Sequence, residues 1–216
     1  MERAIIISGF GGQGLLFAGQ VLATAAMIEG REVMWIPSYG PEMRGGAAGC
    51  TVIVDDEPIG SPVVDVAAVV IALTTPSFEK HGRLLGEGSL LIVDGALVSA
   101  TPPAGVEIVA LPFTQLARAA GDDRLVSVVA LGAMLARRPI VSLEALRAGL
   151  ARVVGAKHPE LLAAEVDGAP APLVNRGHCD CLLSDATGYR LLQKTPHVKP
   201  WMRGPDWLIL ASGSLV

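Results

Sequence analysis

The chain has 216 residues and a formal net charge of −4, which fits one domain with an appendage. Because 51% of the residues are hydrophobic and 18% are charged, the chain can bury a sizeable core without disulfides. The weak negative charge argues against a nucleic-acid partner and an anionic membrane surface. We find no signal-peptide core and no apolar stretch of about 18 residues, so we expect a cytoplasmic protein.

The first third of the chain predicts a βαβ unit. The β-branched run at residues 5–7, within a strand at 3–8, suits a strand that is buried on both faces. Residues 15–28 repeat apolar side chains at helical spacing, and Gly30 ends that helix. Residues 33–36 form a second strand. A right-handed crossover should place it beside the first strand as a parallel neighbour.

The remaining core alternates between strands and helices. Residues 37–49 are rich in glycine and polar residues and are expected to form a loop. The further strands are predicted at 50–54, 67–73, 90–93 and 106–111, and the further helices at 76–85, 113–120, 126–136 and 143–153. Ser142 is the candidate N-cap of the last helix. This order predicts an α/β fold: a three-layer, Rossmann-like, open and mostly parallel sheet with helices on both faces.

The character of the sequence changes after Glu165. Five of the fifteen prolines and two of the three tryptophans lie from Pro170 onward, and no sustained helical or alternating period is visible there. We therefore predict a Rossmann-like domain at residues 1–165. Residues 166–216 are expected to form an irregular C-terminal extension that becomes ordered against a partner.

Residues 9–14 read Gly-Phe-Gly-Gly-Gln-Gly and match G-x-G-x-x-G between a strand and a helix. Glycine permits positive φ and the close approach of a phosphate, and a helix N-terminus presents N–H groups to an anion. A dinucleotide site also needs an acid at the end of the second strand. That strand ends in Ile36, Pro37 and Ser38, which argues against NAD and FAD. Three interpretations stay open: a tight packing turn, a site for another phosphate-bearing group, and a partner contact.

A second candidate site lies at residues 38–46. Tyr39, Glu42 and Arg44 place polar tips between glycines and a proline. Open α/β sheets bind ligands at the carboxyl ends of their strands, where Arg44 could clamp a phosphate or carboxylate with two hydrogen bonds. An ordinary solvated loop with a local Glu42–Arg44 pair explains the same residues equally well.

The cysteines do not predict a metal centre. Cys50, Cys179 and Cys181 are the only three, whereas an iron–sulfur cluster usually takes four thiolates. His178 and the distant His197 could join Cys179 and Cys181 around zinc, but zinc cysteines are usually spaced more widely. A reduced pair of cysteines is the simpler interpretation, and we expect this chain alone to bind no metal.

The two candidate segments together resemble a known family. Residues 9–14, followed on the helix by small and apolar residues, and Tyr-Gly-Pro-Glu-Met-Arg-Gly-Gly at residues 39–46 resemble the gamma subunit of 2-oxoacid:ferredoxin oxidoreductases. The resemblance covers residues 3–160. The second segment is more similar to the 2-oxoglutarate type than to the pyruvate type.

The resemblance implies a multi-subunit enzyme that oxidatively decarboxylates a 2-oxoacid, transfers the acyl group to coenzyme A and reduces ferredoxin. Thiamine diphosphate, Mg²⁺ and iron–sulfur clusters would be held by alpha and beta subunits, with a ferredoxin-like subunit as a further candidate partner. This chain would be non-catalytic and would contribute to assembly and to coenzyme A contacts. The residues carried over as the binding set are Gly9, Gly11, Gly12, Gln13, Gly14, Tyr39, Glu42 and Arg44. The alternative is a free-standing nucleotide-binding or regulatory Rossmann-like module.

Overall fold

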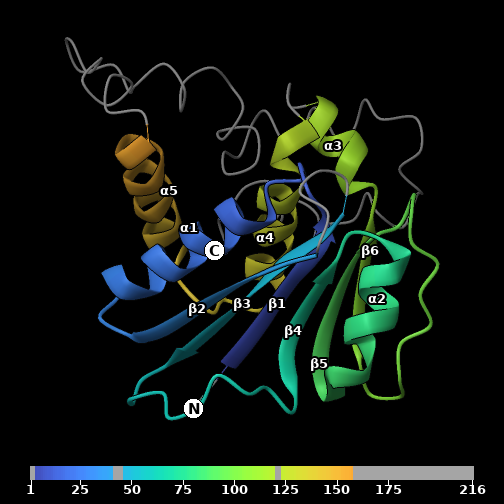
Figure 1. Cartoon of the computed structure of the whole chain (residues 1–216), viewed down its shortest axis with the longest axis horizontal. Helices are drawn as coiled ribbons and strands as arrows, with labels where there is room; N and C mark the ends of the chain where they lie inside the picture. Colours follow the sequence, from blue (N-terminus) through green and yellow to red (C-terminus); the bar gives the residue numbers. More distant parts are fainter. Residues whose placement is uncertain (1–2, 41–45, 120–122, 158–216) are drawn as a thin grey trace, which may run out of the picture.

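A computed structural model describes residues 3–40, 46–119 and 123–157. Its centre is a six-stranded sheet in the order β2-β3-β1-β4-β5-β6, with helices on both faces (Figure 1). The predicted α/β architecture with a mostly parallel sheet is therefore confirmed. The domain boundary at residue 165 and the extension at 166–216 fall outside the described residues.

The elements follow the predicted order with shifted ends. The strands are β1 (Arg3–Phe10), β2 (Glu32–Tyr39), β3 (Ala47–Asp55), β4 (Ala67–Ala72), β5 (Leu85–Asp94) and β6 (Glu107–Leu111). The helices are α1 (Leu15–Ile28), α2 (Thr75–His81), α3 (Phe113–Ala119), α4 (Val126–Arg137) and α5 (Leu143–Lys157), with 3₁₀ turns η1 (Gly82–Leu84) and η2 (Asp123–Leu125). Within the described ranges, no helix is long and apolar enough to span a membrane.

The prediction that the second strand lies directly beside the first is wrong. Strands β1, β4, β5 and β6 form a parallel set, but β3 lies antiparallel between β1 and β2. Part of the predicted loop at 37–49 belongs to these strands, because Ser38 pairs with Gly49 and Tyr39 pairs with Ala48. Gly49 lets β3 lie close to β1, since a Cβ atom there would be 2.6 Å from the Ile7 carbonyl oxygen.

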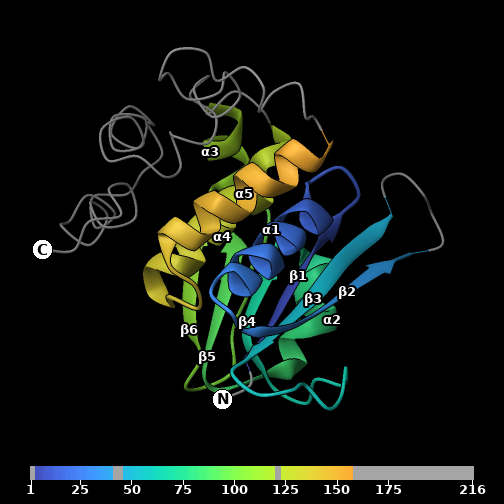
Figure 2. The ribbon, with the colours of Figure 1, turned by 90° about the vertical axis from the view of Figure 1, so that its left-hand side faces the viewer.

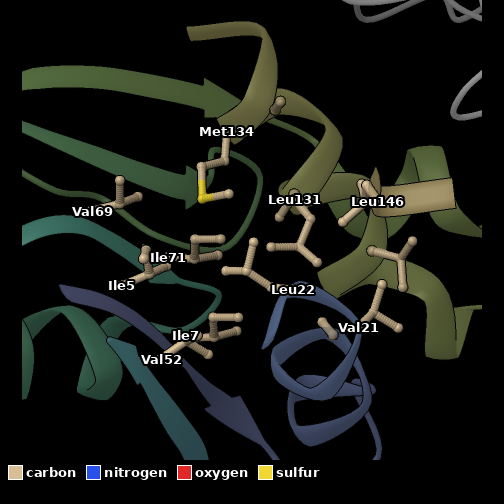
Figure 3. Packing of buried hydrophobic residues seen from close by; sticks show 14 of the residues in the cluster. Ile5, Ile7, Val21, Leu22, Val52, Val69, Ile71, Leu131, Met134 and Leu146 are labelled. Carbon is tan, nitrogen blue, oxygen red and sulfur yellow. The ribbon is translucent and has the colours of Figure 1, made fainter. Parts of the chain in front are cut away.

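The larger core lies between the sheet and α1, α4 and α5, which Figure 2 shows together on one face. Alternate residues of the central strands point into it, among them Ile5, Ile7 and Ile71. They meet Leu22 of α1 and Leu131 of α4 (Figure 3). This alternation explains the continuous apolar runs of the sequence, because each central strand is buried on both faces.

The opposite face carries a smaller core. Ile6, Val70 and Leu91 alternate with the residues above and point to this side. Phe78 of α2 packs against them, and α2 lies behind the sheet in Figure 2. The two faces are therefore covered unequally.

Small residues allow α5 to lie directly against α1 (Figure 2). A Cβ atom on Gly149 would be 2.9 Å from the Val21 carbonyl oxygen and 3.0 Å from the Ala25 amide nitrogen. The Ser142 hydroxyl accepts a hydrogen bond from the Ala145 N–H at 3.1 Å, which confirms the predicted N-cap of α5. The alanine-rich composition thus serves close helix packing.

Asp94 at the end of β5 positions α3. Its carboxylate is fully buried and accepts hydrogen bonds from the Thr114 N–H at 2.7 Å and the Thr114 hydroxyl at 2.6 Å. The Ala96 N–H donates to the other oxygen at 3.1 Å. A buried carboxylate needs such hydrogen-bond partners. Asp94 therefore has a structural role, which is to hold the start of α3 against the end of β5.

Candidate functional site

The glycine-rich turn between β1 and α1 is closed by one of its own side chains. Gln13 Oε1 accepts a hydrogen bond from the backbone N–H of Phe10 at 2.7 Å. A Cβ atom on Gly9 would lie 2.2 Å from that oxygen, so a larger residue there would displace the Gln13 side chain from this position. The Gln13 N–H also donates to the Phe10 carbonyl at 3.3 Å. Gln13 therefore holds the turn in shape.

Gly14 joins the turn to the start of α4. It is the N-cap of α1, with φ +72°, and a Cβ atom there would lie 2.3 Å from the Arg124 carbonyl oxygen. The Ser127 hydroxyl donates to the Gln13 carbonyl at 2.8 Å. Packing thus accounts for Gly14. Gly12 differs, because at φ +105° it has open space where a Cβ would be.

The turn and the β2–β3 pair meet at the carboxyl edge of the sheet. The Gly11 N–H donates to the Gly46 carbonyl at 3.0 Å, and the Gly40 N–H donates to the Ala47 carbonyl at 2.7 Å. Tyr39, at the end of β2, is 70% exposed. Glu42 and Arg44 lie outside the described residues.

The turn lines a pocket of about 380 Å³ between the start of α1 and the strands β2 and β3; we name it the turn pocket. Phe10, Phe17 and Tyr39 give it aromatic walls, Gly12 forms part of its rim, and Arg124 contributes a cation. Apolar walls with a few polar groups are typical of sites for organic ligands. The arrangement fits a ligand with an apolar part and an anionic group.

A second pocket, of about 220 Å³, lies on the α2 side of the same edge; we name it the hydroxyl pocket. Its wall includes Ser8, Thr74 and Ser77, together with Lys80 and His81. None of the five belongs to the site residues that the sequence predicts. The segment Thr-Thr-Pro-Ser at 74–77 is the signal that could have found them, because it places an N-cap hydroxyl directly after a buried strand.

Cys50 lines the hydroxyl pocket as well, but its thiol is buried. Burial raises the pKa of Cys50 to about 11, which outweighs the lowering effect of hydrogen bonds with the Trp35 side chain and the Gly19 backbone. The Cys50 Sγ donates to the Leu15 carbonyl at 3.5 Å. The thiol is protonated at neutral pH and is a poor nucleophile.

The strand order adds a second argument against a dinucleotide. In a dinucleotide-binding unit the acid that binds the ribose stands at the end of the strand next to β1. Here β3 occupies that position, so the end of β2 lies one strand spacing, about 4.8 Å, further away.

The described residues contain no group of three or more His, Cys, Asp or Glu side chains that could hold a metal ion. The weak zinc candidates His178, Cys179, Cys181 and His197 lie outside these residues.

Comparison with known proteins identifies the fold family. Residues 4–169 match the family described as "Pyruvate ferredoxin/flavodoxin oxidoreductase". The chain belongs to this family. It is 36% identical over 169 residues to the 2-oxoglutarate synthase subunit KorC of Methanocaldococcus jannaschii, a match that covers 76% of this chain and 90% of that subunit.

Two further family members resemble the chain. It is 40% identical over 135 residues to the ketoisovalerate oxidoreductase subunit VorA of Methanothermobacter thermautotrophicus, which covers 62% of this chain but spans only 28% of that subunit. The crystal structure of a keto/oxoacid ferredoxin oxidoreductase gamma subunit from Geobacter sulfurreducens PCA matches with a TM-score of 0.60 and 35% identity, over 74% of this chain and 89% of that one.

These matches confirm the resemblance to gamma subunits of 2-oxoacid:ferredoxin oxidoreductases. The similar subunits are named for 2-oxoglutarate and for ketoisovalerate. The preference for the 2-oxoglutarate type therefore stays a prediction.

Proposed function

We propose that this chain acts in a cytoplasmic enzyme that oxidatively decarboxylates a 2-oxoacid to acyl-CoA and CO₂ and passes the electrons to ferredoxin. The similarity to KorC, which extends over 90% of that subunit, carries the proposal. The same similarity favours 2-oxoglutarate as the substrate.

The proposal divides the work between subunits. Thiamine diphosphate, Mg²⁺ and iron–sulfur clusters belong to the alpha and beta subunits and to a ferredoxin-like subunit. This chain supplies no catalytic group in this proposal, in agreement with the buried, protonated thiol of Cys50. Its contributions are assembly and contacts to coenzyme A.

The turn pocket supports the coenzyme A contact. Phe10, Phe17 and Tyr39 offer apolar area to the organic part of the ligand, Gly12 leaves the turn open, and Arg124 adds positive charge. The proposed contact set retains Gly9, Gly11, Gly12, Gln13, Gly14, Tyr39, Glu42 and Arg44. Within this set Gly9, Gln13 and Gly14 act by shaping the turn.

Copurification tests the proposal. An affinity-tagged chain, isolated from cells that make it naturally, should bring down larger subunits with the visible absorption of iron–sulfur clusters. The complex should reduce ferredoxin when it receives coenzyme A and a 2-oxoacid, and a comparison of 2-oxoglutarate, pyruvate and ketoisovalerate identifies the substrate. A colourless chain that purifies alone and binds a nucleotide would instead establish the free-standing module.

Arg44 tests the contact itself. Arg44→Lys keeps the charge but loses the two-pronged guanidinium, whereas Arg44→Ala loses both. If Arg44 holds coenzyme A, both variants should raise the KM for coenzyme A while the complex stays assembled. A role in assembly would instead weaken copurification in Arg44→Ala. Normal assembly and kinetics in both variants would leave only a solvated loop.

A further inference from the structure

The hydroxyl pocket contains a buried cluster of three hydroxyl groups. Ser8 Oγ donates to Ser77 Oγ at 3.1 Å, Thr74 Oγ1 and Ser77 Oγ share a hydrogen bond at 2.8 Å, and the Ser77 N–H donates to Thr74 Oγ1 at 3.3 Å. All three residues are at most 5% exposed. They come from β1 and from the segment that starts α2, so the fold brings together groups 69 residues apart.

The cluster has one more proton than its internal bonds use. Three hydroxyl protons serve two hydroxyl–hydroxyl bonds. One proton therefore has no acceptor among the described residues, whichever way the Thr74–Ser77 bond is oriented. Buried donors normally find a partner, and these hydroxyls line the pocket. The spare donor is available to an acceptor in the pocket.

The charge around the pocket also favours an anion. Lys80 lines it and forms no ion pair with the described part of the chain, and none of the described lining residues is acidic. His81 lies beside it. Burial, followed by the charges of Lys80 and Arg83, lowers the pKa of His81 to about 4. The imidazole is therefore neutral at neutral pH and can donate one N–H.

We propose that the hydroxyl pocket binds a small oxyanion, the phosphate or carboxylate group of a metabolite. Lys80 supplies the charge, and the hydroxyl cluster and His81 supply hydrogen-bond donors. The hydroxyl pocket adjoins the turn pocket and shares Phe10, Tyr39, Ala47 and Ala48 with it. The site goes beyond the coenzyme A contact because its hydroxyl cluster, Lys80 and His81 lie on the α2 side of the sheet edge and do not line the turn pocket. The volume of about 220 Å³ accepts such a group with part of the molecule that carries it.

NMR titration of the full-length chain tests the site at constant ionic strength. Inorganic phosphate and acetate are the two probes, and the reporters are the amides of Thr74 and Ser77 and the imidazole of His81, assigned with His81→Gln. At least one probe should give saturable shifts with a Kd of roughly 1 mM. Phosphate alone would identify a phosphate site, acetate alone a carboxylate site, and both a general oxyanion site.

Two matched variants distinguish specific binding in the pocket from general electrostatic attraction of anions to this part of the surface. Lys80→Gln removes a cation of the pocket wall, whereas Arg83→Gln removes a neighbouring exposed cation that is not part of the lining. We expect Lys80→Gln to weaken binding about tenfold, as loss of a charged hydrogen bond does, and Arg83→Gln to change it less than twofold. The absence of saturable shifts with both probes, or equal weakening by the two variants, would overturn the proposal. Since the chain is titrated alone, this outcome is independent of whether it copurifies with an oxidoreductase.

Discussion

The two faces of the sheet differ in what their side chains do. On the side of α1, α4 and α5, strand residues such as Ile7 continue into a dense apolar core (Figure 3). On the side of α2, Ile6 contributes to a small core, and the next residue on that side, Ser8, already belongs to the hydroxyl pocket. Adjacent residues of one strand thus serve packing and a polar site. We infer that the larger face supplies most of the stability.

The largest expected effect comes from matched truncations on the two faces. Leu22 of α1 and Leu91 of β5 are both fully buried. Leu22→Ala should cost about 3–5 kcal/mol, and Leu91→Ala about 2–3 kcal/mol, because Leu91 belongs to the smaller cluster, in which fewer buried residues surround the cavity. Denaturant unfolding measures both values. An equal or greater loss in Leu91→Ala would break the comparison.

Within the glycine turn, one position packs against the larger face and another is open. Gly14→Ala combines positive φ with a Cβ placed 2.3 Å from the Arg124 carbonyl oxygen, and should cost about 3 kcal/mol. Gly12→Ala also places a side chain at positive φ, +105°, but without a clash, and should cost about 1–2 kcal/mol. Similar unfolding free energies for the two variants would show that packing against η2 does not explain Gly14.

A smaller effect is expected on the α2 face, where His81 should make the free energy of unfolding depend on pH. The pKa of His81 falls from its ordinary value of 6.5 to about 4 on folding, so the unfolded chain binds the extra proton between these values. His81 thus favours the folded state fully above pH 6.5 and loses this contribution as the pH falls toward 4. Because the residue is only partly buried, solvent screening limits the change to about 1 kcal/mol. Unfolding of the wild type and His81→Gln across this range should show a flatter profile in the variant; parallel profiles would contradict the shift.

Local patterns predict much of the fold. Residues 5–7 and 67–72 are apolar runs typical of buried strands, and residues 15–28 repeat apolar side chains at helical spacing. The place of β3 does not follow from such patterns. It depends on pairing with two strands at once and on the close approach of Gly49 to Ile7, and neither leaves a local period in the sequence.

The candidate site, too, has one part that the sequence predicts and one part that it does not. The turn at residues 9–14 and its closeness to Tyr39 follow from a motif and from the rule that open sheets bind at their carboxyl edge. The hydroxyl pocket does not, because Ser8 and Ser77 meet only through the pairing of β1 with β4 and the placement of α2. A motif reports neighbours in sequence, and this pocket is made by neighbours in space.

The most direct test of the account compares two exposed side chains in the assembled enzyme. Tyr39 lies at the carboxyl edge and is 70% exposed, whereas Met27 lies at the far end of α1 and is 62% exposed. We expect Tyr39→Ala to raise the KM for coenzyme A about tenfold, as loss of one aromatic contact does, with thermal stability and subunit composition unchanged. Met27→Ala should match the wild type in all three. An unchanged KM in Tyr39→Ala, or an equal rise in Met27→Ala, would contradict the claim that this edge meets coenzyme A.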